Sequence, residues 1–454
     1  MRKTIIPLVL FGLIAFGCGV LNFDQTETTP DAPRPLQPQT PAEETTEQVV
    51  PAEVTTPQEP EIQSTPVDVT QFAASNNAFA FDIYNQAAAN NPDNNLFFSP
   101  YSIYTALGMT YAGAKRDTEE QMRNALYFAD DAVSQHAAFM DMSRKLNKIG
   151  QRDKAQLSVA NGVFQAKLHE KALLPEYQNI LKKYYGSEMY SLDFAKAKES
   201  ADYINDWVME RTNKRIKNMV SEQHIQSSNN GMLLVNAIFF KANWLKQFNP
   251  KYTNVMSFYP VPEKEFPVNM MYARDDFSYT EVADMQVIEL PYDEEELSML
   301  VFLPIKSSEI PEFNNDIVFE AMKLLRKQDV RLWLPSFTLE LELGEIVEML
   351  ENMGMTDAFD VRLADFTGIR DPKAGADLFI KDILHKAFIE VNEEGTEAAA
   401  ATAVVMATKS TAMPDEKMPI IFRADHPFTY MIVHRPSQTI LFMGKLSDPP
   451  RAEK

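Results

Sequence analysis

Cysteine is nearly absent from this chain: among 454 residues there is one, Cys18. A single thiol cannot form an intramolecular disulfide framework, and it cannot supply a thiolate metal site. Basic residues are also in the minority, with 43 Lys and Arg against 64 Asp and Glu and a net charge of -21. Because phosphate backbones are bound by clustered Lys and Arg, nucleic acid is not expected as a partner.

Motifs for catalysis and metal binding are missing as well. The chain has no Gly-rich phosphate loop, no nucleophile elbow and no zinc-binding helix pair. The histidines, none of which has metal-ligand spacing to another His or Cys, are His136, His169, His224, His385, His426 and His434. The acidic run 293–296 lies between two apolar runs and is typical of a solvated turn. We therefore expect no metal, no other cofactor and no enzymatic activity.

The first 20 residues have the layout of an export signal. Arg2 and Lys3 precede an apolar run, and small residues surround Cys18. The segment resembles a bacterial lipoprotein signal: Gly17 fits that pattern, although Phe16 stands where a small residue is usual. The resemblance implies a signal peptide over 1–18, acylation of Cys18, and a lipid-anchored protein in the cell envelope or at the cell surface. The alternatives are a single membrane anchor or an ordinary signal peptide, which would give an extracellular protein.

Composition changes sharply over residues 19–66. This segment is rich in Pro, Thr, Glu and Gln, and Arg34 is its only basic residue. Such a segment cannot bury enough apolar surface to offset the entropy of ordering, so it is predicted to be a disordered tether. The folded domain then spans 67–454.

Helical patterns dominate the first part of that domain. Phe72, Phe79 and Ile83 recur at helical spacing, which predicts an amphipathic helix ending near "ANNPDNN". In "NLFFSPYSIYTALGMTYAGA" a short strand leads into a helix opened by Pro100, with Ser99 as its N-cap. Further helical patterns cover residues 118–126 and 201–216.

Strand-like runs dominate the later part, and several are continuously apolar, as in strands buried on both faces. These runs are residues 231–240, 285–292, 297–304, 330–342, 385–391, 428–433 and 439–446. Helices followed by many strands, without steady alternation of the two, predict an α+β fold with large mixed sheets.

One segment, 393–410 ("EEGTEAAAATAVVMATKS"), combines helix-forming alanines with strand-forming valines. Read as a strand, it places Thr396 and every second residue to Met406 on one face, which begins small and ends apolar. Gly395 could act as a hinge because it lacks the steric limits of other residues. The segment could thus be exposed in one state and form a central strand in another. An Ala-rich helix over 393–407 is the alternative.

The stretch "VNEEGTEAAAATA" closely resembles the reactive-loop hinge of the serpins. Other stretches resemble further motifs of that family in the same order: "NLFFSPYSI", "LSVANGVF", "LLVNAIFFKANW", "HKAFIEV" and "DHPFTYMIV…LFMGKLSDP". Together they span about residues 68–449. Thr429 departs from the pattern, because an apolar residue is usual there, and the segment after Ser410 is longer than in many members.

The resemblance implies one domain with three β-sheets, about nine helices and a metastable native state that exposes a reactive loop near 393–415. It also implies a serine protease inhibitor. The target protease cuts the loop and forms an acyl-enzyme, and the cut loop then inserts into the main sheet and traps the covalent complex. Serine proteases are the expected partners, cysteine proteases are a second class, and the chain is expected to act as a monomer.

The resemblance also assigns roles to single residues. Gly395 and Thr396 would form the loop hinge, followed by Glu397, Ala398, Ala399, Ala400 and Ala401. Family spacing from Gly395 places the reactive bond at Lys409–Ser410, and a lysine there suits the acidic pocket of a trypsin-like protease. Met406–Ala407 or Met413 are alternatives that would suit elastase- or subtilisin-like enzymes.

The same comparison implies a polar cluster that controls opening of the main sheet, formed by Ser99, Ser102, Asn236 and His385. Trp244 would lie where insertion starts. The alternative for each is an ordinary buried polar or aromatic residue. At the level of function, the alternatives are a non-inhibitory serpin-fold protein that binds or carries a ligand at the surface, and a hydrolase, for which no motif exists.

Overall fold

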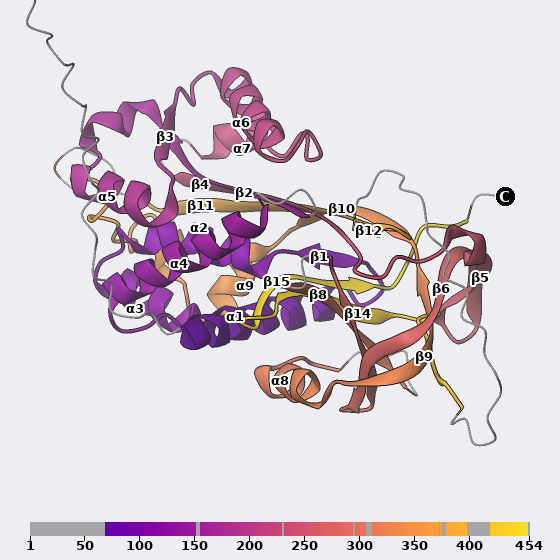
Figure 1. Cartoon of the computed structure of the whole chain (residues 1–454). Coiled ribbons are helices and arrows are strands. Elements are labelled where there is room, and N and C mark those ends of the chain that lie inside the picture. Colours follow the sequence, from indigo (N-terminus) through magenta and orange to yellow (C-terminus); the bar gives the residue numbers. More distant parts are fainter. Residues whose placement is uncertain are drawn as a thin grey trace, which may run out of the picture. The chain divides into compact units, whose positions relative to one another are not determined.

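The computed structural model describes residues 69–150, 155–228, 231–293, 296–305, 311–371, 373, 378–396 and 418–452 (Figure 1). All of them belong to one compact unit, Gln63–Lys454. Several predictions lie outside the described residues: the signal peptide with Cys18, the tether, Glu397, Ala398 to Ala401, and the bond Lys409–Ser410.

The described residues form nine α-helices, in agreement with the expected number. They are α1 Val69–Asn90, α2 Pro100–Tyr111, α3 Arg116–Ala125, α4 Ala132–Gly150, α5 Pro175–Ile180, α6 Ala197–Arg211, α7 Glu222–Ser227, α8 Asn315–Leu324 and α9 Ile346–Asn352. Short helical turns are η1 Lys167–Ala172, η2 Leu181–Tyr185, η3 Pro250–Tyr252 and η4 Asp357–Phe359. Among these residues, no helix has the length and apolar character needed to cross a bilayer.

The first predicted helix of the domain is confirmed. Helix α1 contains Phe72, Phe79 and Ile83, all buried. Ser99 is the N-cap of α2: its Oγ accepts a hydrogen bond from the backbone N–H of Ser102, and Pro100 occupies the first helical position. That cap satisfies one of the backbone donors left free at a helix start, so the local sequence is enough to begin α2 here.

Fifteen strands are described. They are β1 Leu96–Phe98, β2 Ala155–Ala166, β3 Met189–Leu192, β4 Met232–Asn243, β5 Asn254–Val261, β6 Lys264–Val282, β7 Met285–Pro291, β8 Leu297–Pro304, β9 Arg326–Pro335, β10 Phe337–Leu343, β11 Ile380–Val391, β12 Gly395–Thr396, β13 Ile420–Arg423, β14 Phe428–His434 and β15 Thr439–Leu446. They confirm an α+β fold with large mixed sheets.

The larger sheet has nine strands in the order β1-β15-β14-β8-β7-β6-β9-β13, with β5 paired to β6. Strand β6 runs through both halves of this sheet, because its first part pairs with β5 and its last part with β7. The described residues therefore form two hydrogen-bonded sheets, where the family resemblance implied three.

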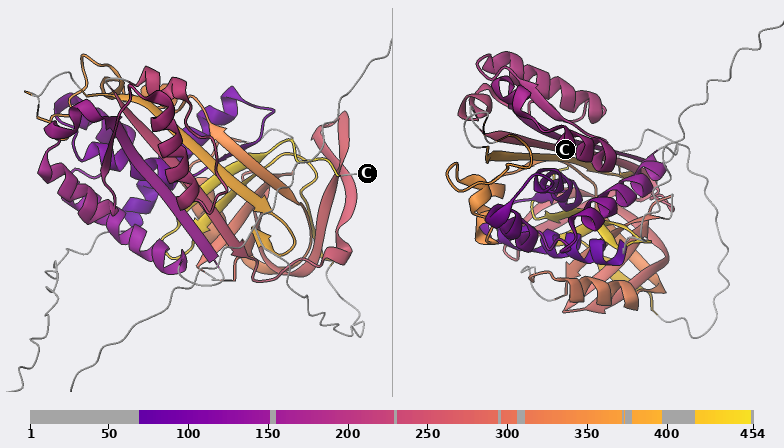
Figure 2. Two further views of the ribbon diagram at one scale, coloured as in Figure 1. Left: turned by 90° about the horizontal axis from the view of Figure 1, so that it is seen from above. Right: turned by 90° about the vertical axis from the view of Figure 1, so that its left-hand side faces the viewer.

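The smaller sheet has six strands in the order β10-β11-β12-β4-β2-β3, and β11 also pairs directly with β4. Helices cover both of its faces: α6 and α7 lie on one side, and α1, α2 and α4 on the other (Figure 1). Most helices gather toward one end of the strands, while β5 and β6 lie at the opposite end (Figure 2). Side chains of β4 accordingly alternate between two apolar cores, one under α6 and the other against α2.

Two sequence predictions need correction. The run 330–342 is two strands: β9 ends at Pro335 and β10 begins at Phe337 in the other sheet. Proline has no N–H for the ladder, so the chain changes sheets there. The helical pattern over 201–216 ends at Arg211, because Asn213 and Lys214 have positive φ.

A substitution at Gly444 tests how tightly the larger sheet is packed at β15. A Cβ added there would lie 2.5 Å from the Tyr430 ring and 2.7 Å from the Leu96 carbonyl oxygen. We expect Gly444→Ala to lower the free energy of unfolding by about 1–3 kcal/mol through overpacking, measured by urea denaturation. Gly344→Ala is the matched control, because nothing lies within 4 Å of its Cβ position. Equal stability of the two variants would contradict the packing at Gly444.

Candidate functional site

The smaller sheet contains a parallel pair of strands that parts at one end. Strands β4 and β11 pair from Met232 and Ile380 up to Phe239 and Phe388. Beyond that point β12 lies between them, antiparallel to both, with Thr396 opposite Ala242 on β4 and Val391 on β11. The segment that leads into 397–417 therefore already occupies the gap between the two strands.

Gly395 is required at this entry by close approach of the backbone. A Cβ at this position would lie 2.2 Å from the carbonyl oxygen of Ala242 and 2.6 Å from the Cα of Asn243. Its φ is not in the left-handed region. The sequence predicts a hinge at Gly395, and this contact does not test that role. What the contact shows is that only glycine lets β12 lie against β4.

A turn precedes β12 and is held by Asn392. Its Oδ1 accepts hydrogen bonds from the backbone N–H groups of Glu394 and Gly395, both at 3.1 Å. Its own N–H donates to the Gly395 carbonyl at 2.9 Å. Asn392 thereby reverses the chain between β11 and β12, as asparagine does in many tight turns.

Trp244 packs directly beside this turn. Its indole N–H donates to the Asn392 carbonyl at 2.9 Å, and its ring stacks on Tyr292 with centroids 4.7 Å apart. The Tyr292 hydroxyl lies 2.8 Å from the Thr396 Oγ1. Burial raises the pKa of Tyr292, so the phenol keeps its proton for this hydrogen bond. Thr396 is fully buried, and it contacts Tyr292, whose ring is fixed by stacking on Trp244.

The four residues predicted as a sheet-opening cluster lie together at the middle of the sheet. Asn236 on β4 is directly opposite His385 on β11, and Asn161 on β2 is opposite Asn236. Ser99 and Ser102 reach the same place from the start of α2. All four predicted residues are fully buried.

Hydrogen bonds fix the tautomer of His385. The Ser99 backbone N–H donates to His385 Nε2 at 3.0 Å, so this nitrogen must be the acceptor. The ring proton is therefore on Nδ1, which donates to Asn236 Oδ1. A neutral imidazole thus joins β11 to both β4 and α2.

The remaining polar atoms of the cluster are satisfied in the same way. Asn236 Nδ2 donates to Ser102 Oγ and to Asn161 Oδ1. Ser102 Oγ donates to Asn161 Oδ1 at 3.2 Å, and Ser99 Oγ donates to the Leu441 carbonyl at 2.6 Å. Because buried polar groups are costly when unpaired, separating β4 from β11 would require new partners for Asn236 and His385.

Sequence reasoning missed three members of this arrangement: Asn161, Tyr292 and Asn392. Asn161 lies in a stretch, "LSVANGVF", that carried the family resemblance, but nothing in one strand indicates its partner on the next. Tyr292 follows an apolar strand and Asn392 precedes the glutamates, and neither position has a local signal. No group of His, Cys, Asp and Glu suited to a metal occurs among the described residues.

Comparisons with known proteins agree with this geometry. The family model described as serpin (serine protease inhibitor) matches residues 74–449. The chain belongs to the serpin family. An uncharacterized serpin-like protein of Methanosarcina acetivorans is 37% identical over 404 residues, which cover 87% of this chain and 92% of the relative.

Two further relatives have informative names. The leukocyte elastase inhibitor of Sus scrofa is 37% identical over 392 residues, covering 84% of this serpin and all of the relative. The crystal structure of human thyroxine-binding globulin, complexed with its ligand, has a TM-score of 0.73 at 26% identity and covers 84% of this chain and all of that one. The first is named for protease inhibition and the second for binding thyroxine.

The departure from the family pattern at Thr429 has a structural explanation. Thr429 is fully buried in β14, and its Oγ1 lies 2.6 Å from the hydroxyl of Tyr84 on α1. The two hydroxyls satisfy each other, so a polar residue is tolerated in this core position.

His385 makes the closed sheet sensitive to acid. Burial lowers the pKa of His385 from 6.5 to about 3, and it lowers the pKa of His136 and of His434 to about 4. As pH falls below 6.5, these histidines become protonated in the unfolded chain but stay neutral in the folded chain. The free energy of unfolding therefore decreases. The contribution of His385 to the free energy of unfolding is fully present above pH 6.5 and is lost as the pH falls toward about 3.

We therefore expect His385→Gln to flatten the fall of stability on acidification. Glutamine can keep one donor and one acceptor without titrating, and a single such histidine contributes at most about 1.4 kcal/mol per pH unit. Urea unfolding between about pH 5 and about pH 8 measures the slope of the free energy of unfolding against pH. His224→Gln on exposed α7 is the control, because glutamine preserves a capping box. Equal slopes for the His385 variant and the wild type would contradict a buried neutral His385.

Proposed function

We propose that this serpin inhibits proteases as a suicide substrate whose cut loop inserts between β4 and β11. The observation that carries the proposal is the position of β12. The strand pairs with both β4 and β11 at the end where they part, and it leads directly into 397–417. Insertion of a cut serpin loop with release of stored strain is established behaviour in this family.

The register of β12 defines where an inserted loop would lie. Each residue forward from Thr396 pairs with one residue back from Ala242 on β4, so the ladder could continue to Met406, opposite Met232 at the start of β4. The same rule puts Thr396, Ala398 and Ala400 on the face toward α2, since directly paired residues share a face. In the sequence analysis, this is the face that begins with small residues.

Insertion would be favourable because it replaces one ladder of interstrand hydrogen bonds with two. The parallel pair β4–β11 would separate, and the new strand would pair antiparallel with each of them. Antiparallel pairing is slightly the more stable of the two per residue. The alanines would also bury apolar surface without needing much space between the strands.

The same register offers a replacement for the bond between Asn236 and His385. Six residues beyond Thr396 is Thr402, and six residues back from Ala242 is Asn236. Six residues back from Val391 on β11 is His385. Thr402 would therefore come between the two, and its hydroxyl can both donate and accept. The inserted strand would thus supply the partner that sheet opening removes.

The proposed bait bond is Lys409–Ser410, which directs the inhibitor to trypsin-like serine proteases. A lysine side chain suits an acidic specificity pocket. Similarity to leukocyte elastase inhibitor supports protease inhibition, and it keeps Met406–Ala407 as an alternative bond for elastase-like enzymes. Cysteine proteases form the second class of target.

Export and a lipid anchor on Cys18 are part of the proposal. They rest on the basic start, the apolar run and the single cysteine of the first 20 residues. An anchored inhibitor on a tether would intercept proteases at the cell surface.

A ligand carrier is the second candidate function, favoured by the similarity to thyroxine-binding globulin. Large or charged residues at the hinge would suit a carrier, because they hinder insertion. The small residues from Ala398 to Ala401 favour the inhibitor.

Incubation with trypsin tests the inhibitor. We expect a covalent complex that survives denaturing electrophoresis, and mass spectrometry should find a new N-terminus at Ser410. Lys409→Gln should slow complex formation by about a hundredfold or more, because the acidic pocket loses its charged partner. Clean cleavage of the loop with trypsin left fully active would refute inhibition and favour the carrier. A covalent complex cleaved after Met406 would place the bait bond at Met406–Ala407 instead of Lys409–Ser410.

The inward face of the loop can be tested by adding a charge. Ala400→Arg would have to bury a guanidinium toward α2 on insertion, at a cost of several kcal/mol. We expect the variant to be cleaved as a substrate, with trypsin activity recovering fully. Glu397→Arg is the matched control, since position 397 is on the other face and already carries a charge. Undiminished inhibition by Ala400→Arg, measured as moles of inhibitor per mole of trypsin, would show that the face assignment is wrong.

A further inference from the structure

The chain that leaves segment 397–417 is held by one short strand. Strand β13 is the first strand after this segment, and among the described strands it pairs with β9 alone. Phe422 is its one fully buried side chain, whereas Ile421 is 52% exposed. Arg423 lies over the Trp333 ring of β9, with Cζ 5.0 Å from the ring centre. Because β13 buries little apolar surface, the turn that follows has a large share in holding it.

This turn, residues 424–427, reaches two other strands. The carbonyl oxygen of Asp425 accepts a hydrogen bond from the Tyr259 N–H on β5 at 2.7 Å. The ring of His426 reaches the end of β8, where its Nε2 lies 2.9 Å from the carbonyl oxygen of Pro304. The turn therefore joins the end of β13 to β5 and β8.

Both ring nitrogens of His426 lie against oxygen atoms that accept hydrogen bonds. Nε2 faces the carbonyl of Pro304, and Nδ1 lies 3.0 Å from Asp425 Oδ1. A backbone carbonyl and an ionised carboxylate can only accept, so each nitrogen needs a proton to make its bond. The arrangement fits the imidazolium, whereas a neutral ring would leave one nitrogen lone pair facing an oxygen.

The charges around the ring also favour the imidazolium. Partial burial alone would lower the pKa of His426, but the hydrogen bonds to Asp425 and Pro304, together with the charge of Asp425, outweigh it and raise the pKa above 6.5. Tyr259 contacts the turn through its backbone N–H, and Asp284 in the β6–β7 turn accepts from the residue after Pro304 through its backbone carbonyl. Asp425 thus supplies the charge that acts on the ring.

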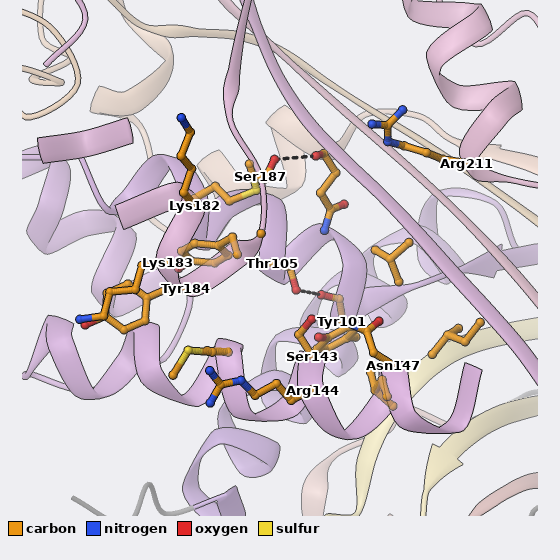
Figure 3. A pocket seen from close by; sticks show the side chains of 18 of the residues that line it. Tyr101, Thr105, Ser143, Arg144, Asn147, Lys182, Lys183, Tyr184, Ser187 and Arg211 are labelled. Carbon is orange, nitrogen blue, oxygen red and sulfur yellow. Dashed lines mark hydrogen bonds between the residues drawn. The ribbon is translucent and has the colours of Figure 1, made fainter. Parts of the chain in front are cut away.

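Other ionisable groups in the structure respond to pH differently. A pocket of about 410 Å³ among α2, α4 and α6 has cationic side chains in its lining, labelled in Figure 3 as Arg144, Lys182, Lys183 and Arg211. Residues of these types keep their charge through the neutral range. His136, His385 and His434 are kept neutral by burial. At His426 the charged form is favoured instead, so its bonds depend on pH near neutrality.

We propose that His426 is a positioning residue that, in its protonated form, anchors β13 to β8. Loss of the proton removes one of the two hydrogen bonds and the charge opposite Asp425, so the turn holds β13 less firmly. One side chain thereby controls how tightly the chain after segment 397–417 stays on the larger sheet.

Acid tightens this anchor and alkali loosens it. Below pH 6.5 the ring is protonated whether or not β13 is anchored, and the anchored form has its full stabilisation. As the pH rises through the raised pKa of His426, that stabilisation is lost. The response is opposite to the one expected from His385.

Strand β13 lies at the end of the smaller sheet where β12 enters. Arg423 is opposite Trp333 near the end of β9, and β9 leads directly into β10. Phe337, the first residue of β10, is opposite Val391 on β11, which also pairs with Thr396. The strands on both sides of segment 397–417 therefore meet at this one end.

For the proposed inhibitor, a firm anchor opposes insertion of an uncut loop. An uncut loop inserted from Thr396 to Met406 would run about 33 Å away from the entry of β12. Residues 407–417 can span about 40 Å at most, so they would be drawn nearly straight while β13 stays in place. This consequence rests on the proposed function, whereas the anchor itself does not.

Hydrogen–deuterium exchange of the full chain tests the anchor, with mass spectrometry of peptides that cover 418–427. After correction for the intrinsic exchange rate, protection of β13 should fall about fivefold or more between about pH 6 and about pH 8.5, because the ring loses its proton. Peptides from β15 are the internal reference. Unchanged protection of β13 across this range would overturn the proposal.

Two substitutions separate the charge of the side chain from its shape. His426→Arg keeps several donors and a charge that does not titrate, so β13 should stay protected at both pH values. His426→Gln loses the charge, so protection should be about fivefold or more below that of the wild type at about pH 6, and it should not change with pH. His224→Gln on α7 is the matched control and should keep the wild-type change. A wild-type change with pH in His426→Gln would contradict the proposal.

NMR titration of the histidine ring protons is a second test, made on the wild-type chain. The His426 signal, identified by its absence in His426→Gln, should titrate above pH 6.5. A lower apparent pKa would also overturn the proposal.

Residual inhibition of trypsin tests the functional consequence separately. The chain is incubated at about pH 6 or about pH 8.5 and then assayed at one common pH. Inhibition should be lost about threefold or more faster at the higher pH in the wild type, and at equal rates in His426→Arg. If the chain does not inhibit trypsin at all, the proposed function fails, and hydrogen exchange still decides the anchor.

Discussion

The pairing of β4 with β11 is the interaction on which the rest of this structure depends. It joins two parallel strands side by side in the smaller sheet, and it brings Asn236 opposite His385. The covering helices, the entry of β12 and the polar cluster are all arranged around this seam. If β4 and β11 separate, the cluster loses the bond between Asn236 and His385, and β12 gains room to extend.

Two groups of side chains hold the seam, and they differ in chemistry. At the entry, Trp244, Tyr292 and Thr396 form an aromatic and hydroxyl contact that keeps the first loop residues buried. At the middle, neutral His385 accepts from Ser99 and donates to Asn236. In the proposed mechanism, the first group would determine where a strand enters. The second group would make separation of β4 and β11 costly until a replacement hydrogen-bonding group arrives.

Much of the fold was predictable because its signals are local. The period of apolar residues in α1, the Ser99 cap with Pro100, and the apolar runs of β4, β7, β8 and β14 all depend on neighbours within one turn or one strand. Predictions were wrong where a boundary depended on distant contacts. The run 330–342 has continuous strand character, and only the packing of two sheets shows that β9 ends at Pro335 and β10 belongs elsewhere. Strand β6 is long and mixes polar with apolar residues without steady alternation, so its place in the larger sheet had no clear local signal.

The sequence by itself determined the composition of the segment that starts at Gly395, with small residues at alternate positions, from which a strand was predicted. It also contained the residues of the polar cluster, recognised through family resemblance. Only the tertiary structure decided that Asn236 faces His385, which is 149 positions further along the chain, that Asn161 joins them, and that Gly395 is needed because β4 lies against it. The physical reason is that strand partners are selected by the packing of whole sheets, which the spacing of residues within one strand does not encode.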